Sequence, residues 1–232
     1  LSYLNAEALS VAAPILLLWL LAPAITWRLS KEETEKKPNL SQAQHLFLHK
    51  SARRTWSYFE QFVNAESNWL PPDNFQEEPI AVLAHRTSPT NMGLSLLANL
   101  AAYDFGYIGG REMLERCNNS IQTMLKLERY SGHFYNWYDT LTLLPLHPKY
   151  VSTVDSGNLV GHLLTLRQGI LSQIHQPIFT DRNYEGLVTT IKIIRDLQGD
   201  DGKHTEKILS VLNSAIEEKS NSLSVAKKHL NK

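Results

Sequence analysis

Polar and aromatic side chains that could bind a ligand are concentrated in three short stretches of the sequence, at 85–91, 132–140 and 151–158. The middle stretch is the richest and carries, in succession, Tyr135, Asn136, Trp137, Tyr138 and Asp139. Flat aromatic rings suit the C–H face of a pyranose, and carboxylate and amide groups can pair with its hydroxyls. The middle stretch therefore predicts a carbohydrate site. The alternative is that the rings fill a core and Asp139 caps a turn.

The first stretch combines a fixed cation with small polar residues. Arg86 is followed by Thr87 and, four residues later, by Asn91. These side chains form either a polar rim of a binding site or an ordinary helix start. In the second case Ser88 or Thr90 would be the N-cap.

The third stretch leads into a predicted helix. Asp155 or Ser156 is expected to be its N-cap, with Asn158 in the following turn. The free N–H groups of a helix start could hold an anion or a sugar oxygen. Capping alone explains the pattern equally well. The three stretches together give the candidate substrate-binding residues Arg86, Thr87, Asn91, Tyr135, Asn136, Trp137, Tyr138, Asp139, Asp155, Ser156 and Asn158.

Catalytic residues are not assigned by these patterns. Asp139 and Asp155 are the carboxylates in the three stretches, and would be the pair to test if the chain acted alone. Retaining glycosidases need such a pair about 5–5.5 Å apart. The nine histidines show no H-E-x-x-H pattern and the single Cys117 excludes a cysteine cluster, so no metal site is expected. A net charge of zero gives no reason to expect nucleic acid.

These stretches must be positioned by helices. Apolar residues recur with a period near 3.6 in several segments, whereas the stretch at 134–154 is the one that could be extended. Helices are predicted at 40–65, 91–103, 111–129, 158–172, 184–197 and 205–230. Successive helices joined by short loops indicate an all-α fold of stacked helix hairpins, either a bundle or an α/α toroid.

The chain opens with a candidate membrane helix. Residues 8–27 carry no charge and are long enough to cross the hydrocarbon layer, and Pro14 and Pro23 are tolerated in such a helix. A signal peptide or a buried core helix is the alternative. Basic residues follow at Arg28, Lys31, Lys36 and Lys37, which predicts that everything after residue 28 is cytoplasmic. The expected organisation is a transmembrane helix at 1–30, a charged linker at 31–40 and a helical domain at 41–232.

The sequence from about residue 69 to 169 resembles the cyclic β-1,2-glucan synthases, large bacterial inner-membrane proteins. The matching motifs are WLPPD at 69–73, RTSPTN at 86–91, AYDFGYI at 102–108, LER at 127–129, GHFYNWYDT at 132–140, PKYVSTVDSGNL at 148–159 and GHLL at 161–164. Several motifs in one order are more specific than any one of them.

The resemblance implies a fold and a function. It implies that residues 41–232 are the first part of an incomplete (α/α)6-type barrel, in a domain that cyclises β-1,2-glucan by transglycosylation. UDP-glucose is the donor in the full-length family, used by another domain, and no cofactor is expected in this fragment. The implied partners are the glucan chain, the lipid bilayer and the remaining domains of the same polypeptide. The catalytic glutamates of the family have no match here, so the resemblance assigns the candidate residues to substrate binding.

Other readings remain open, namely a hydrolase or phosphorylase acting on a β-glucan, or a membrane-anchored helical interaction module without chemistry. Two structural expectations follow from the preferred reading. The three polar stretches should converge on one concave surface. If the chain is cut inside a toroid, Leu209, Leu212 and Ile216 of the last helix should expose an apolar face.

Overall fold

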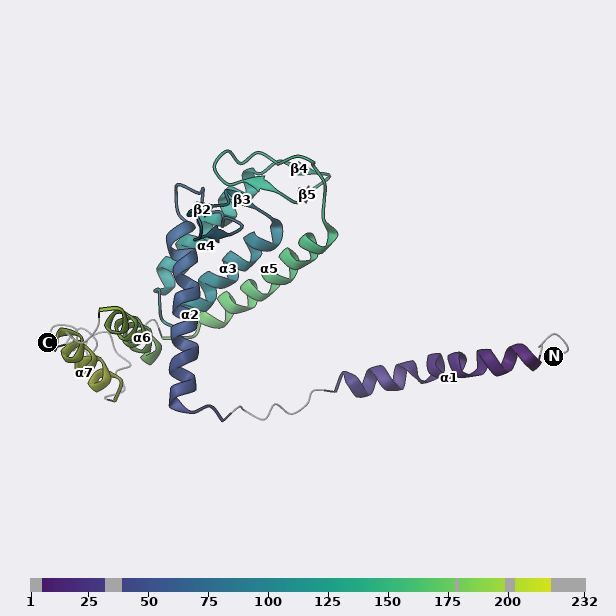
Figure 1. Ribbon diagram of the computed structural model, residues 1–232, viewed down its shortest axis with the longest axis horizontal. Helices are drawn as coiled ribbons and strands as arrows, with labels where there is room; N and C mark the ends of the chain where they lie inside the picture. Colours follow the sequence, from purple (N-terminus) through teal and green to yellow (C-terminus); the bar gives the residue numbers. More distant parts are fainter. Residues whose placement is uncertain (1–5, 32–38, 178–179, 199–202, 218–232) are drawn as a thin grey trace. The chain divides into compact units, whose positions relative to one another are not determined.

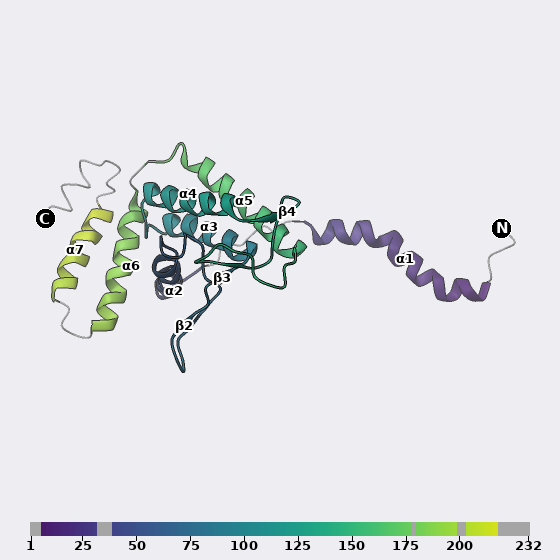
Figure 2. The ribbon, with the colours of Figure 1, turned by 90° about the horizontal axis from the view of Figure 1, so that it is seen from above.

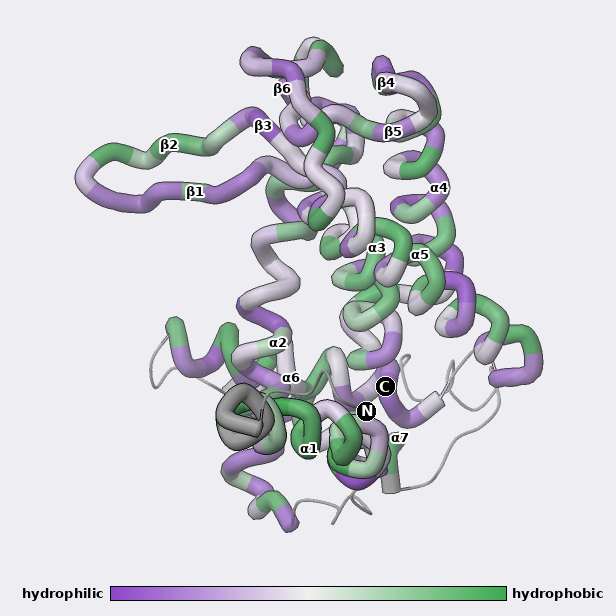
Figure 3. The backbone as a smooth tube through the Cα atoms, turned by 90° about the vertical axis from the view of Figure 1, so that its right-hand side faces the viewer, coloured by the Kyte–Doolittle hydropathy of each residue, from purple (hydrophilic) through white to green (hydrophobic). Residues whose placement is uncertain are grey.

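The computed structural model (Figure 1) describes residues 6–31, 39–177, 180–198 and 203–217, and the chain divides into two compact units, Leu1–Ser41 and Gln42–Lys232. The first unit contains helix α1 (Ala6–Leu29), with Pro14 and Pro23 inside it. Its 19-residue portion Val11–Leu29 is long and apolar enough to cross a membrane, and none of that portion is buried within the protein. Figure 3 shows the predominantly hydrophobic colouring of α1.

The second unit is built from six helices and three small antiparallel sheets within its described residues. The helices are α2 (Gln42–Phe62), α3 (Pro89–Asp104), α4 (Gly110–Lys126), α5 (Thr153–Gln173), α6 (Asp181–Gln198) and α7 (Lys203–Glu217). Each corresponds to a helix predicted from the sequence, so the all-α class and the hairpin arrangement are confirmed. The predicted continuation of the last helix beyond residue 217 lies outside the described residues.

The strands are two residues long and connect loops rather than form a core sheet. They pair as β1 (Phe75–Gln76) with β2 (Val82–Leu83), β3 (Arg86–Thr87) with β6 (Tyr138–Asp139), and β4 (Arg129–Tyr130) with β5 (His133–Phe134). The β1–β2 hairpin projects away from the helices (Figures 2 and 3). The β3–β6 pair joins the first polar stretch to the second, so it brings together segments about fifty residues apart.

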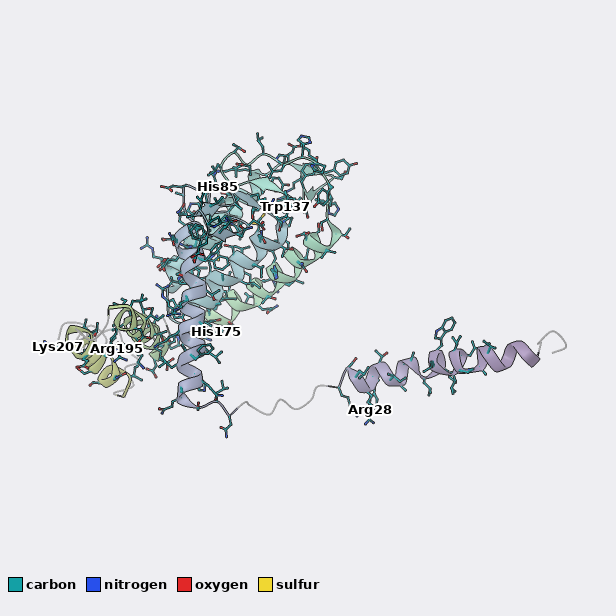
Figure 4. The ribbon with its side chains drawn as sticks, in the orientation of Figure 1. Arg28, His85, Trp137, His175, Arg195 and Lys207 are labelled. Atoms are coloured by element: carbon teal, nitrogen blue, oxygen red, sulfur yellow. The ribbon has the colours of Figure 1, made fainter. Side chains whose placement is uncertain are left out.

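Helices α3 and α5 run in the same direction and pack closely along their length. A Cβ atom added to Gly93 would lie 2.9 Å from the Cβ of His162, and one added to Gly169 would lie 2.3 Å from Leu100. The two glycines therefore allow the helices to approach, and because both helices start at the same end of the unit, their N-termini are neighbours. Figure 4 shows Trp137 and His85 at that end and His175 at the opposite one.

A buried arginine ties three of the helices together. Arg116 of α4 is 8% exposed. Its Nε donates to Asn99 Oδ1 of α3 at 2.8 Å, and its Nη2 donates to the carbonyls of Phe59 and Val63, at 2.9 and 3.1 Å, at the end of α2. The Phe59 carbonyl also accepts from the N–H of Val63 at 3.1 Å, and the guanidinium adds a partner from another helix to the carbonyls at the end of α2.

The expectation for the last helix is wrong. Leu209 and Leu212 of α7 are only 7% and 4% exposed, and Ile216 packs beside them. The three residues face Tyr184 and Val188 of α6 in a second hydrophobic cluster. Helix α7 buries its apolar face against α6, the helix that precedes it in the hairpin.

Candidate functional site

The first polar stretch and the third form the starts of α3 and α5. Ser88 is the N-cap of α3 and its Oγ accepts from the N–H of Asn91 at 3.3 Å. Ser152 is the N-cap of α5 and accepts from the N–H of Asp155 at 3.1 Å. Ser88 was one of the two predicted caps, whereas Asp155 and Ser156 are not caps. They lie in the first turn, because Ser152 supplies a capping hydroxyl three residues earlier.

Asp155 reaches across to the start of α3. Burial of its carboxylate acts to raise its pKa, but hydrogen bonds from Ser152, Thr90 and Ser88 outweigh burial and hold the pKa below its usual range. Asn158 continues the contact one turn further along, where its Nδ2 donates to Thr90 Oγ1 at 3.1 Å. The ionised carboxylate thus stabilises two helix N-termini, each of which carries a partial positive charge. Ser156 donates to the carbonyl of Ser152 at 2.8 Å.

The second polar stretch lies against these helix starts, and Asn136 is its centre. Hydrogen-bond partners fix the orientation of the buried Asn136 amide. Its Nδ2 donates to Asp155 Oδ2 at 2.8 Å. Its Oδ1 accepts from Trp137 Nε1 at 2.8 Å and from Tyr150 Oη at 2.7 Å. Asn136 is 6% exposed and fully engaged, so it holds the indole and the carboxylate in place and is not itself available to a ligand.

Arg86 lies over the ring of Trp137. The guanidinium carbon is 4.9 Å from the indole centroid. Asp73 holds this arginine by accepting from Arg86 Nε at 3.1 Å and from Arg86 Nη2 at 2.9 Å. The other oxygen of Asp73 accepts from Asn91 Nδ2 at 3.1 Å. Arg86 retains 51% of its side-chain exposure, so this cation remains accessible to solvent.

Asp139 is engaged locally. Its Oδ1 accepts from the N–H of Leu141 at 2.9 Å, the N–H of Thr142 at 2.7 Å and the hydroxyl of Thr142 at 3.0 Å. Burial acts to raise the pKa of Asp139, but these hydrogen bonds outweigh it and lower the pKa. This is the turn-capping arrangement that the sequence left open as the alternative to sugar binding.

Two further candidates are inaccessible. Thr87 and Tyr138 are both 0% exposed, so neither side chain can contact a ligand. Tyr138 donates to the carbonyl of Glu128 at 2.6 Å and accepts from the N–H of Tyr135 at 2.8 Å. Burial raises its pKa to about 12. Tyr138 is therefore a core residue. The Tyr135 ring is half-buried, with Lys149 Nζ 5.3 Å from its centroid.

The three stretches therefore converge at one end of the second unit, as expected. The hollows described for this unit lie elsewhere: one of about 190 Å³ is lined by α2 and α3, one of about 600 Å³ by α2, α6 and α7, and one of about 570 Å³ lies near the end of α5. The expected concavity is thus not found in these three hollows. We call the polar group formed by Asp73, Arg86, Asn91, Trp137 and Asp155, with Asn136 beneath it, the Trp137 cluster.

Sequence reasoning missed two members of this network, Asp73 and Tyr150. Asp73 follows Pro71 and Pro72, a context that predicts only a turn. The local pattern gives no sign that Asp73 pairs with Arg86, thirteen residues later, because the contact depends on the β1–β2 hairpin, whose strands are only two residues long. Tyr150 lies in a loop and carries no periodic signal.

Neither Asp139 nor Asp155 is suited to the role of a general acid. Asp139 and Asp155 both have lowered pKa values, so neither would carry a proton at neutral pH as a general acid must. Within the described part of the chain, no group of three or more histidine, cysteine, aspartate or glutamate residues could hold a metal ion.

Comparison with known proteins gives one close sequence relative. Over 157 residues, or 67% of this chain, the sequence is 49% identical to the cyclic beta-(1,2)-glucan synthase NdvB of Rhizobium meliloti (strain 1021). The matched part is 6% of that relative's length. No protein-family profile matches the chain.

Among solved structures, a glucoamylase-like protein from Bacteroides fragilis NCTC 9343 is similar at a TM-score of 0.47 and 18% identity, over 70% of this chain and 38% of that chain. The sequence relationship is the stronger of the two. Identity of 49% over two thirds of its residues makes this chain similar to a short part of a cyclic beta-(1,2)-glucan synthase.

Proposed function

We propose that the second unit is the first part of an α/α-barrel domain that binds β-1,2-glucan and cyclises it by transglycosylation, within a larger synthase. The observation that carries the proposal is the 49% identity to a cyclic β-1,2-glucan synthase over 157 residues. The Trp137 cluster would supply the binding chemistry, since it combines a partly exposed indole with an accessible guanidinium.

The charges of the cluster favour a neutral ligand. The Arg86 cation is paired with Asp73, and Asp155 adds a further negative charge nearby. An anionic ligand would meet this excess of carboxylates, whereas a neutral sugar can donate its hydroxyls to the carboxylates and accept from the guanidinium. UDP-glucose, the donor proposed for the complete enzyme, is accordingly assigned to another domain.

Catalysis is assigned to residues elsewhere in the synthase. Asp139 and Asp155 are both committed to hydrogen bonds within the protein, so the role proposed for this unit is to orient the glucan. Segments further along the same barrel domain would supply the acid and the nucleophile.

Membrane attachment is the second element of the proposal. Helix α1 would cross the bacterial inner membrane, with the second unit in the cytoplasm. The length of its apolar portion and the basic residues Arg28 and Lys31 at its end support this. Lys31 Nζ lies 4.0 Å from the ring centroid of Trp27, an aromatic–basic pair suited to the membrane interface.

Calorimetric titration of the full chain in detergent with linear β-1,2-gluco-oligosaccharides tests the proposal. Binding is expected. Trp137→Ala should weaken it by about tenfold or more, because the stacking of a ligand ring on an aromatic side chain contributes on the order of 1–3 kcal/mol. Tyr130→Ala is the matched control, since Tyr130 is an exposed aromatic residue on β4 outside the cluster. If the wild-type chain binds β-1,3-linked oligosaccharides equally well, or if Trp137→Ala binds normally, the proposed site is wrong.

A further inference from the structure

Trp137 presents an asymmetric binding surface. Its indole edge is engaged, because Nε1 donates to Asn136 at 2.8 Å. One ring face is covered by the Arg86 guanidinium, whose carbon lies 4.9 Å from the centroid. Any ligand ring that stacks on this partly buried side chain would therefore have to use the opposite face.

The position of Arg86 depends in turn on Asp73. An arginine side chain that is half exposed has many rotamers, so a stacked arrangement needs an additional contact to hold it. Asp73 Oδ2 accepts from both Nε and Nη2 of Arg86, at 3.1 and 2.9 Å, and the carboxylate is itself oriented by Asn74 and Asn91. Asp73 retains 20% exposure against 51% for Arg86, so it is the less mobile partner.

The backbone fixes the two partners relative to each other. The N–H of Asp73 and the N–H of Arg86 both donate to the carbonyl of Ala84, at 3.1 and 2.7 Å. The two side chains therefore project from the two arms at the base of the β1–β2 hairpin. Their separation does not depend on any contact made by a ligand.

We infer that Asp73 is a positioning residue, which holds Arg86 against one face of Trp137 so that the pair forms a preorganised one-sided platform for a sugar ring. The inference rests on the proposed glucan-binding function. The ligand stacks on the indole face opposite Arg86, and Arg86 contributes by holding the indole in its orientation. Asp73 acts only through Arg86.

A double-mutant cycle on the full chain in detergent tests this inference, with linear β-1,2-gluco-oligosaccharides as the probe. Asp73→Asn alone should weaken binding about tenfold, or about 1.4 kcal/mol. In an Arg86→Gln background the same change should alter affinity by less than about twofold, because a residue that acts through Arg86 has nothing left to position. Glu77→Gln, an exposed carboxylate on the same hairpin, is the control and should bind as wild type.

A measurement without ligand separates this inference from the proposed function. The ¹H–¹⁵N resonance of the Trp137 indole, assigned with Trp137→Phe, should shift in Asp73→Asn and in Arg86→Gln by similar amounts, and stay unchanged in Glu77→Gln. If wild type binds no glucan but the resonance shifts as expected, the proposed function fails and the positioning role stands. An unmoved resonance in Asp73→Asn, or fully additive effects in the cycle, overturns the positioning role. Thermal melting of each variant identifies any loss of folding. Arg86→Gln removes the guanidinium of the Asp73–Arg86 contact, whereas Asp73→Asn removes the charge of the carboxylate.

Discussion

At the residue scale, the carboxylates near Trp137 differ in what they are free to do. Asp73 orients Arg86, Asp155 stabilises two helix starts, and Asp139 closes a turn through one oxygen. All three stand within a group of polar and aromatic residues, yet only the first two belong to the Trp137 cluster. The hydrogen-bond partners, rather than the neighbouring sequence, decide the role of each.

Substitutions at Asp139 should therefore separate a structural role from a ligand role. Asp139→Asn keeps an acceptor oxygen for the N–H groups of Leu141 and Thr142, so glucan affinity should stay within about twofold and stability should fall by less than about 1 kcal/mol. Asp139→Ala leaves these groups unpaired and should cost about 1–2 kcal/mol. Urea denaturation and calorimetry measure the two quantities. A tenfold loss of affinity in Asp139→Asn would restore the carboxylate to the binding site.

Cys117 is a buried thiol that should be chemically inert in the folded chain. It is 4% exposed, and burial raises its pKa to about 11 from 9.0, despite the nearby Arg116 cation. At pH 8 only about a thousandth of the thiol would be ionised, and the thiolate is the reactive form. Reaction with a thiol-specific disulfide reagent should be slow in buffer and fast in concentrated urea. Because the pKa is raised on folding, the contribution of this thiol to stability is complete below about pH 9 and falls as the pH rises towards 11. Rapid labelling of the native chain at pH 8 would contradict the predicted inertness of the Cys117 thiol.

At the element scale, close approach of backbones sets the arrangement of the helices. Gly93 and Gly169 allow α3 and α5 to lie side by side. A similar contact joins α6 to the turn after α3, where Gly106 has φ +72° and a Cβ on Gly186 would lie 2.2 Å from the Gly106 carbonyl oxygen. A helix-forming residue would ordinarily be preferred at position 186, so the glycine there serves this contact.

The contact at Gly186 predicts a stability change opposite to the one expected from helix propensity. Gly186→Ala should destabilise the chain by about 1–3 kcal/mol, because backbone atoms cannot yield as a flexible side chain can. Gly161→Ala is the matched control: Gly161 is an exposed glycine of α5 with nothing within 4 Å of an added Cβ, and the change should stabilise by about 0.5–1 kcal/mol. Urea denaturation of the full chain in detergent measures both. Equal stabilities for the two variants would show that α6 does not approach Gly106 this closely.

At the scale of the whole molecule, the chain joins an apolar helix to a helical unit with a buried core. Leu16, Leu20 and Trp19 of α1 are 52%, 76% and 72% exposed, so their apolar surface has no cover within the first unit. In a bilayer, hydrocarbon rather than water would surround these apolar side chains, so their exposure would carry no hydrophobic cost. The second unit, in contrast, has its own core around α2 to α5.

The topology of α1 is tested in living bacteria by reporters fused after Lys37. A reporter that is active only in the cytoplasm should be active, and one that is active only in the periplasm should be silent, since basic residues follow the helix on its C-terminal side. Replacing Arg28, Lys31, Lys36 and Lys37 by glutamine should weaken the preference. Strong activity of the periplasmic reporter in the unmodified chain would reverse the proposed orientation.

Residue order alone determined the helical class of this protein and the location of its helices. Periodic apolar residues and capping hydroxyls act over a few neighbouring positions, so they can be read without a fold. The helix start at Ser88 and the apolar length of α1 are of this kind. The polar stretches could also be found locally, since aromatic and amide residues adjacent in sequence stay adjacent in space.

Only the tertiary structure decided what those polar residues do. Tyr138 and Trp137 are neighbours in sequence, yet one ring is fully buried and the other half-exposed, because the β3–β6 pairing turns them to opposite sides. Asp73 became part of the cluster through its contacts with Arg86 and Asn91 across the base of a hairpin, and Leu209 was buried by a partner helix. Such outcomes depend on which surfaces meet, and that is a property of the packed chain rather than of any short stretch of it.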